Sequence, residues 1–155
     1  MDSSNLQKFI DENEIEATIL PMKAHTLTVE DAARVLEVEP SQIIKSLVFH
    51  VDGTPLLVIN NGFDRVDSRK LAIYLNVGRK RVKFAAPDLA FDLTGYIVGS
   101  MPPFGHKQKL RTVVDPAVTW QEVIYGGGGD IDAMLRLTPS ELLEVTRAEV
   151  TALSD

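Results

Sequence analysis

Short apolar stretches alternate with polar and turn-forming segments along the whole chain of 155 residues. Where apolar positions recur every three to four residues, the pattern predicts helices at residues 3–13, 28–36, 67–74, 87–95 and 138–146. Alternating or continuous apolar runs predict strands at residues 16–20, 43–51, 55–60, 81–85, 111–114, 123–125, 132–137 and 149–152. These elements interleave without the regular spacing of a doubly wound sheet, which predicts a mixed α/β fold in a single domain, residues 1–155.

Side-chain chemistry marks several boundaries of these elements. Asp52-Gly53 between two apolar runs predicts a tight hairpin. Thr28 and Thr138 each precede an acidic residue by three positions, which is typical of a capping box at a helix start. Asp67 is a further candidate cap. The continuous apolar run at residues 55–60 indicates a strand buried on both faces.

Lys45 is an unusual residue within the strand at 43–51. With a period of two, its side chain shares a strand face with four apolar residues, Ile43, Leu47, Phe49 and Val51. Lysine is seldom buried without a partner. One interpretation is a lysine near a strand end whose ammonium reaches water along its aliphatic stem. The other is a cation at the mouth of an apolar pocket, placed to meet an anion or a carbonyl group.

The segment from Thr94 to Gly105 contains three glycines and a double proline in twelve residues. Glycine permits close approach of a ligand to the backbone, and proline stiffens a turn. The composition therefore suggests a rigid loop whose N–H groups face a ligand. A plain surface turn has the same composition.

Residue usage and the length of the apolar runs exclude several classes of site and of protein. The chain has no cysteine, so disulfides and thiolate metal sites are excluded, and its three histidines show no metal-ligand spacing. We therefore expect no metal and no cofactor. No apolar run approaches the roughly 18 residues of a membrane span, and the first residues lack the pattern of a signal peptide, so we expect a cytoplasmic protein without membrane contact.

Basic residues gather in two segments of an otherwise acidic chain of net charge −6. Residues 62–83 carry a net charge of +5, and residues 105–111 carry three basic side chains and no acid. These segments suit contact with a short stretch of polyphosphate chain. An ordinary solvated surface is the alternative. The candidate contacts are Arg69, Lys70, Lys107 and Lys109.

The chain lacks the familiar catalytic motifs. It has no cysteine nucleophile, no Gly-x-Ser-x-Gly elbow, no phosphate-binding P-loop and no evident carboxylate pair. His50 alternates away from Lys45 and is interpreted as structural or exposed. An enzyme built from these residues would act mainly by positioning its substrate and by backbone electrostatics.

Two motifs at a defined spacing resemble a known family. They are the run Ile44-Lys45-Ser46-Leu47-Val48-Phe49 after His25-Thr26, and Thr94-Gly95-Tyr96 leading to Gly99-x-x-x-Pro103-Phe104-Gly105. Together they are similar to the aminoacyl-tRNA deacylases, which include free-standing trans-editing proteins and the insertion domain of bacterial prolyl-tRNA synthetases. The resemblance covers about residues 5–150, and it implies a central mixed β-barrel with short helices packed outside.

The resemblance also implies a set of site residues. Lys45 and the backbone of Gly99 would be catalytic, with Lys45 either gripping the phosphate of the terminal adenosine or polarising the ester carbonyl. The substrate-binding residues would be His25, Thr26, Ser100, Met101, Pro102, Pro103, Phe104, Gly105, Gly128 and Gly129. For Thr26, a local turn hydrogen bond is an equally simple explanation. The four glycines at 126–129 predict a mobile turn or a place where a ligand needs space.

This chain departs from the family pattern at two places. Asp130 stands where many relatives have a basic residue or histidine after the glycines, and Ser100-Met101-Pro102 differs from the usual versions of the loop. Met101 would either shape the pocket or fill the core.

The implied function is hydrolysis of the ester of a mischarged aminoacyl-tRNA, with alanine or cysteine on proline tRNA as the expected substrate. Arg69, Lys70, Lys107 and Lys109 would then contact tRNA. The expected partners are the acceptor end of aminoacyl-tRNA and, as a candidate, prolyl-tRNA synthetase. The alternative functions are a non-catalytic module that binds the acceptor end or a synthetase, and a sensor of a small ligand.

Overall fold

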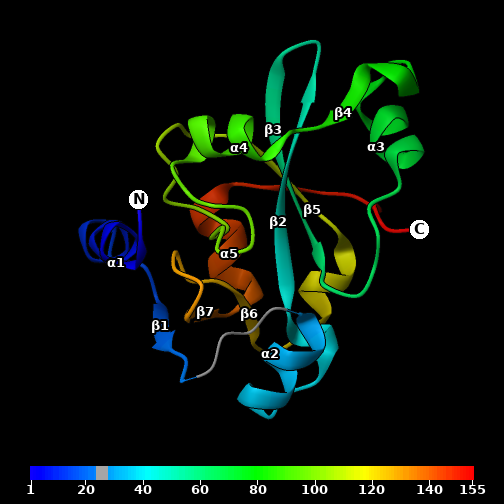
Figure 1. Cartoon of the computed structure of the whole chain (residues 1–155). Coiled ribbons are helices and arrows are strands. Elements are labelled where there is room, and N and C mark those ends of the chain that lie inside the picture. The colour runs from blue at the N-terminus through cyan, green and yellow to red at the C-terminus, as the bar shows by residue number, and fades with distance from the viewer. Residues whose placement is uncertain (24–27) are drawn as a thin grey trace.

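The computed structural model describes residues 1–23 and 28–155, and the elements predicted from the sequence are present within two residues of their expected bounds (Figure 1). The helices are α1 (Ser3–Glu12), α2 (Val29–Leu36), α3 (Ser68–Leu75), α4 (Pro87–Thr94) and α5 (Pro139–Thr146). Short 3-10 helices, which the pattern did not predict, are η1 (Pro40–Gln42), η2 (Arg79–Arg81) and η3 (Pro116–Trp120). The strands are β1 (Ala17–Pro21), β2 (Ile44–Val51), β3 (Thr54–Asn61), β4 (Val82–Phe84), β5 (Arg111–Val114), β6 (Ile124–Gly127), β7 (Ala133–Leu137) and β8 (Glu149–Val150).

Local chemistry explains where several elements begin and turn. The Thr28 and Thr138 hydroxyls accept hydrogen bonds from the Asp31 and Glu141 N–H groups, so both threonines cap their helices as predicted, without the return bond from the acidic side chain that completes a capping box. Asp67 likewise caps α3 by accepting from the Arg69 N–H. The predicted hairpin is also confirmed, since β2 and β3 pair in an antiparallel ladder around Asp52-Gly53.

The strands form two sheets. One has the order β4-β2-β3-β5-β8 and is mixed, and the other has the order β1-β7-β6 and is antiparallel. A single parallel bridge between Ile43 and Tyr125 links them. The mixed α/β prediction is confirmed. No closed barrel is found in the described part of the chain, because β2 and β6 meet at this bridge without a continuous ladder, and the predicted barrel is therefore unconfirmed.

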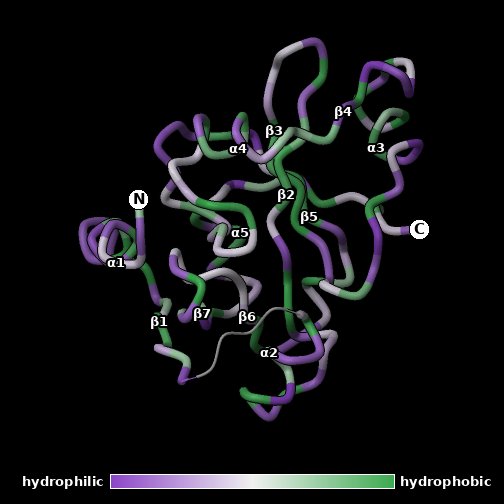
Figure 2. Tube along the Cα trace, viewed as in Figure 1, coloured by the Kyte–Doolittle hydropathy of each residue, from purple (hydrophilic) through white to green (hydrophobic). Residues whose placement is uncertain are grey.

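Both faces of the five-stranded sheet are covered by apolar packing. One face joins β6, β7, α1 and α5 in a core that includes Ile44, Val48 and Leu57. The other face packs under α3 and includes Phe49 and Val58. The burial of β3 on both faces, as its continuous apolar run predicts, is confirmed. In Figure 2 the most hydrophobic segments follow β2, β3 and β5 through the middle of the molecule. No helix among the described residues is long and apolar enough to cross a bilayer.

Asp115 fastens the C-terminal segment to the five-stranded sheet. Its side chain is only 5% exposed and accepts hydrogen bonds from the N–H groups of Ala117, Leu153 and Ser154 at 2.8–2.9 Å. Burial opposes the charged form, but the backbone hydrogen bonds from Leu153, Ala117 and Ser154 together hold the pKa of Asp115 below its usual value of 3.8. No sequence pattern singles out this residue.

We expect Asp115→Asn to lower the free energy of unfolding at pH 7 by about 2 kcal/mol, since the new amide group turns a donor toward backbone donors. The folded pKa is depressed, so the stabilisation is complete above the unfolded pKa and is lost as the pH falls through the folded pKa. Urea unfolding should therefore show the difference shrinking below about pH 4. Asp92→Asn, at an exposed position on α4, is the matched control. Equal stability of wild type and Asp115→Asn at pH 7 would contradict this role.

Candidate functional site

Lys45 lies one residue into β2, on the face that carries Leu47 and Phe49. The predicted alternation is confirmed, because Ile44 and Val48 pack into the opposite core. The Lys45 side chain is half-buried and forms no ion pair with any described residue. Burial lowers the pKa of Lys45, partly offset by the negative charge of Asp64. The ammonium is thus a partly desolvated cation that makes no ion pair or hydrogen bond with the described residues.

The loop after α4 begins with a left-handed glycine at the helix end and then makes a turn from Ile97 to Ser100. Gly99 has a φ of +99°, and its α-carbon faces open space. The Ser100 hydroxyl donates to the Ile97 carbonyl oxygen at 2.9 Å, which braces the turn from inside. Neither the Gly99 N–H nor the Met101 N–H donates a hydrogen bond to any described residue.

The same loop lies directly against the backbone of β6. A methyl group on Gly127 would overlap the Met101 carbonyl oxygen, and it would stand 2.7 Å from the carbonyl carbon of Met101 and 2.9 Å from that of Ser100. The Gly129 N–H donates to the Ser100 carbonyl oxygen at 2.9 Å. Gly127 therefore has a close-approach role, because any side chain there would push away the Met101 carbonyl group and, with it, the Ser100–Met101 peptide.

Strand register brings Lys45 to the same side as this peptide. The parallel bridge between Ile43 and Tyr125, and the contact of Gly126 with the Ile44 side chain, set a register that puts Lys45 level with Gly127. Because alternate residues share a face, the missing Gly127 side chain would point to the Lys45 face. That is the direction in which the Ser100–Met101 peptide lies. A cation and unpaired backbone donors thus flank the junction of the two sheets, which is an arrangement suited to negative charge on an oxygen.

The rest of the predicted loop is mostly buried. The side chains of Met101 and Phe104 pack in the main core, so the core-filling interpretation fits Met101. Pro103 lies over Gly126 on the face opposite Lys45. Gly105 has a φ of +76° and sits tightly against Phe9 and Leu6.

His106 and Tyr96 stiffen the loop through a hydrogen bond and a ring contact. The Pro102 carbonyl oxygen accepts a hydrogen bond from His106 Nε2 at 2.7 Å, and the two aromatic rings meet edge to face, with centroids 6.2 Å apart. Burial lowers the pKa of His106 and raises the pKa of Tyr96 to about 12. Both side chains are therefore neutral at pH 7, and neither contributes a charge to the site.

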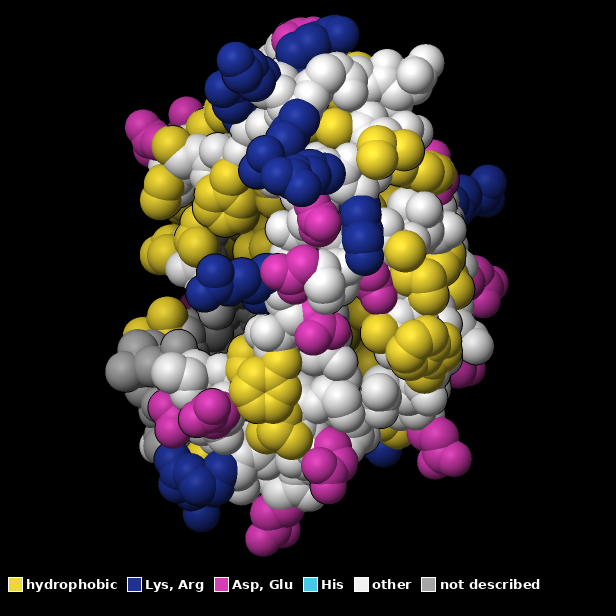
Figure 3. All heavy atoms as spheres, turned by 90° about the vertical axis from the view of Figure 1, so that its right-hand side faces the viewer, with side chains coloured by type: hydrophobic (Ala, Val, Ile, Leu, Met, Phe, Trp, Pro, Cys, Tyr) yellow, Lys and Arg dark blue, Asp and Glu magenta, His cyan; other side chains and the backbone are white. Residues whose placement is uncertain are grey.

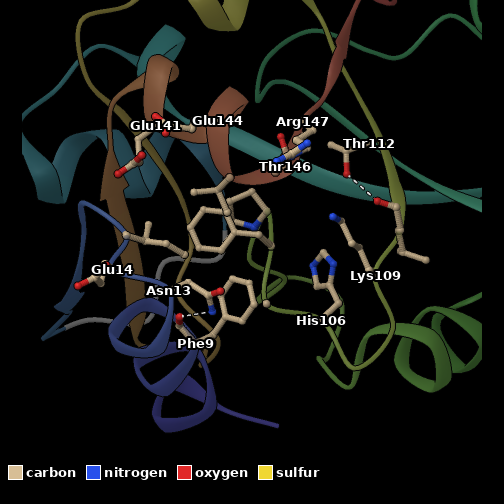
Figure 4. Close-up of a pocket in the computed structure, with 16 residues that line it drawn as sticks. Phe9, Asn13, Glu14, His106, Lys109, Thr112, Glu141, Glu144, Thr146 and Arg147 are labelled. Atoms are coloured by element: carbon tan, nitrogen blue, oxygen red, sulfur yellow. Dashed lines mark hydrogen bonds between the residues drawn. The ribbon is translucent and has the colours of Figure 1, made fainter.

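A cavity of about 530 Å³ lies on the other side of the loop, between α1 and α5 (Figure 4). The predicted residues Pro103, Phe104, Gly105 and Lys109 line it, whereas Lys45 and Gly99 do not. Figure 4 shows Glu14, Glu141 and Glu144 on one side of this cavity and His106, Lys109 and Arg147 on the other. The cations that line it, Lys109 and Arg147, are exposed, whereas Lys45 is half-buried, so we place the candidate site at Lys45 instead.

The four predicted basic contacts lie in two places. Arg69 and Lys70 project from α3 beside the basic residues of η2 and β4, and Figure 3 shows Lys and Arg side chains gathered over these elements. The Lys70 ammonium donates to the Ser154 carbonyl oxygen. Lys109 lines the cavity of Figure 4, and Lys107 is exposed in the same loop.

Packing accounts for the late glycines and the acid after them. Gly128 and Gly129 are buried, the first against Ala133 and the second against the start of α1. Asp130 accepts a hydrogen bond from the Ser3 N–H at 3.0 Å, so the departure from the family pattern serves to anchor α1. His25 and Thr26 lie outside the described residues, and their predicted roles stay predictions. Within the described ranges, no cluster of three acidic or histidine side chains could hold a metal ion.

Asn60 is a site residue that the sequence patterns did not bring out. It is fully buried and is the direct cross-strand partner of Lys45. The hairpin register holds a signal for this pair, because counting back from Val51 and Thr54, on either side of Asp52-Gly53, leads to Lys45 opposite Asn60.

Comparison with known proteins gives a consistent set of relatives. A family model described as "Aminoacyl-tRNA editing domain" matches residues 23–145. The uncharacterized protein YwhH of Bacillus subtilis is 25% identical over 136 residues, covering 87% of this chain and 85% of that protein. Proline--tRNA ligase of Listeria innocua is 29% identical over 120 residues, which cover 77% of this chain and 21% of the ligase.

Solved structures with the same fold cover nearly the whole chain. One is described as "Crystal structure of a putative trans-editing enzyme for prolyl tRNA synthetase", with a TM-score of 0.92, 28% identity and coverage of 99% of this chain and 96% of that one. Another, hypothetical protein APE2540, has a TM-score of 0.89, 30% identity and coverage of 97% and 99%.

Proposed function

Because this chain belongs to the family of aminoacyl-tRNA editing domains, we propose that it hydrolyses the ester bond of a mischarged aminoacyl-tRNA. The observation that carries the proposal is the shared face of Lys45 and the Ser100–Met101 peptide, with unpaired N–H groups at Gly99 and Met101. Backbone donors of this kind are suited to the oxyanion of an acyl-transfer intermediate.

An aminoacyl ester is already activated, so the protein needs to place it and stabilise the charge that develops. Water attacks the carbonyl carbon, and the carbonyl oxygen becomes an oxyanion near the Gly99 and Met101 N–H groups. Lys45 supplies positive charge on the same face, where burial strengthens its field. Collapse of the intermediate breaks the ester bond and frees the amino acid and the 3′-hydroxyl of the terminal ribose. The neighbouring 2′-hydroxyl is placed to orient the water.

The proposed substrate is proline tRNA charged with alanine or cysteine. The protein would edit it in trans, after the synthetase has released it. The similarity to prolyl-tRNA ligases and to the structure described for prolyl tRNA synthetase supports this choice. A pocket too small for the proline ring would spare the correct product, as a steric sieve does. The basic side chains on α3 and η2, including Arg69 and Arg79, are exposed and would contact the phosphates of the acceptor stem.

Deacylation of proline tRNA charged separately with alanine, cysteine, serine and proline tests the proposal. We expect release of a non-cognate amino acid well above the buffer rate, with proline spared. Lys107→Gln and Lys109→Gln offer a second comparison. If either lysine contacts tRNA, its loss should weaken binding by the same factor for all four charged forms.

A non-catalytic module that binds the acceptor end is the second candidate, since the same cation and donors would also hold a ligand without hydrolysis. If the protein binds the charged tRNA and releases none of the four amino acids above the buffer rate, the editing proposal is wrong and the binding module stands. Filter binding on the same four preparations separates the two outcomes.

A further inference from the structure

The Asn60 carboxamide is buried, and its nitrogen makes a hydrogen bond whereas its oxygen has no partner among the described residues. Asn60 is fully buried near the end of β3, and its Nδ2 donates to the Asp64 carbonyl oxygen at 2.9 Å. That hydrogen bond identifies which end of the amide is the oxygen. No described residue donates to Oδ1. Buried acceptors in native proteins nearly always have a donor, so this oxygen calls for one.

The Lys45 ammonium is the donor that the strand pairing brings to the same face as this oxygen, and the structure has no direct hydrogen bond between the two. Lys45 and Asn60 are paired in the β2–β3 ladder, so their side chains leave the same face of the sheet with Cβ atoms about 5 Å apart. The next pair along the ladder on that face, Leu47 and Val58, is apolar and offers no polar partner. A lysine stem is long enough to turn its ammonium onto a cross-strand neighbour, directly or through one water.

We propose that Asn60 is a positioning residue for Lys45, and that its Oδ1 accepts a hydrogen bond from the Lys45 ammonium and so aims that cation at the Ser100–Met101 peptide. An amide oxygen suits this task because it orients the ammonium without neutralising it. A carboxylate in the same place would bind the ammonium as an ion pair and compete with the negative charge of a substrate. The catalytic consequence rests on the proposed function, whereas the pairing itself does not.

Three charged residues near Lys45 also affect its pKa, so a test of Asn60 must leave them unchanged. Asp64 and Asp155 favour the charged form of Lys45, and Arg65 opposes it. None of these three is paired with Lys45 as an ion pair among the described residues. A change confined to Asn60 leaves all of them in place.

Two substitutions at one position isolate the acceptor. Asn60→Leu and Asn60→Asp both lose the Nδ2 hydrogen bond to Asp64, so they share that structural cost, but they differ at the oxygen that faces Lys45. The measurement is the NMR titration of the Lys45 side-chain carbon next to the ammonium, assigned with Lys45→Met. We expect the Lys45 pKa to rise by about 1 unit or more in Asn60→Asp and to fall below the wild-type value in Asn60→Leu.

Asn61→Asp is the matched control, because Asn61 pairs with Ile44 and lies on the opposite face of the sheet. It should change the Lys45 pKa much less than Asn60→Asp does. Shifts in the same direction for Asn60→Leu and Asn60→Asp, or no shift in either folded variant, would overturn the pairing. A carboxyl group at position 60 that stays protonated up to pH 8 would overturn it as well, since an adjacent ammonium would keep that group ionised.

Deacylation assays on the same variants distinguish this inference from the proposed function. If the pairing and the editing activity both hold, the alkaline limb of the pH profile of kcat should move with the Lys45 pKa in each variant. If wild type is inactive yet the titrations shift in opposite directions, the pairing stands and the editing proposal fails. If wild type is active and the titrations do not shift, the pairing fails alone.

Discussion

Replacing Lys45 with methionine is expected to lower kcat/KM for deacylation by about 100- to 1000-fold, the usual cost of losing one group that stabilises a developing oxyanion. Methionine keeps most of the apolar stem of lysine on the strand face that also carries Leu47, so the fold should be retained. Thermal unfolding should confirm this, since removing a half-buried cation that forms no ion pair with any described residue costs the folded state little. Single-turnover deacylation of the charged tRNA is the measurement.

The same variant decides between the two roles left open for Lys45. If Lys45 polarises the ester carbonyl, kcat falls and KM changes little. If it grips the phosphate of the terminal adenosine, KM rises with kcat nearly unchanged, because the contact is equally strong in the ground and transition states. Lys83→Met is the matched control, as Lys83 is an exposed lysine on the neighbouring β4. Wild-type activity in Lys45→Met would remove Lys45 from the mechanism.

The hairpin around Lys45 could be predicted in detail, because its determinants are local. The Asp52-Gly53 turn sets the register, the alternation of apolar residues sets the faces, and both act between residues that are close in sequence. The pairing of Lys45 with Asn60 follows from the turn by counting, although the apolar pattern marks residue 60 only as the last position of the predicted strand at 55–60.

The approach of the Ser100–Met101 peptide to Gly127 could not be predicted, because it depends on how two sheets meet. The four late glycines suggested mobility or space for a ligand, whereas Gly127 is required by a contact with backbone from another part of the chain. Non-local contacts between two backbones leave no periodic pattern in the sequence. The hydrogen bonds of Asp115 to residues 153 and 154 are also non-local, so no sequence pattern predicts them. The way in which the two sheets meet is non-local too, so the apolar pattern could not test the barrel implied by the resemblance.

Burial separates the predicted loop residues in a way that composition does not. Gly99 and Ser100 are adjacent, yet Gly99 is exposed and Ser100 is buried under the turn that its own hydroxyl braces. Phe104 packs against Phe9 with ring centroids 5.8 Å apart, so this residue of the loop motif serves the core of the chain. The chemistry of the loop is therefore expected from its backbone more than from its side chains.

Gly127→Ala is expected to lower kcat/KM about 100-fold, because the added methyl group would stand 2.7 Å from the Met101 carbonyl carbon. The clashing atoms belong to backbone, so the loop must move as a unit, and a shift of roughly 1 Å in a catalytic donor typically costs that much. We also expect the free energy of unfolding to fall by about 1–3 kcal/mol from the overpacked contact. Deacylation rates and urea unfolding measure the two effects.

Two other glycines serve as controls for Gly127→Ala. At Gly78 an added methyl group meets nothing within 4 Å, so Gly78→Ala should keep full activity and stability. At Gly126 the methyl group would meet Cγ1 of Ile44 at 3.2 Å and its terminal Cδ1 at 3.4 Å on the opposite face, and that side chain can yield. Gly126→Ala should therefore lose some stability and keep most of its activity. If Gly127→Ala is as active as these two variants, the Ser100–Met101 peptide does not need its present position, and the donors of the reaction must lie elsewhere.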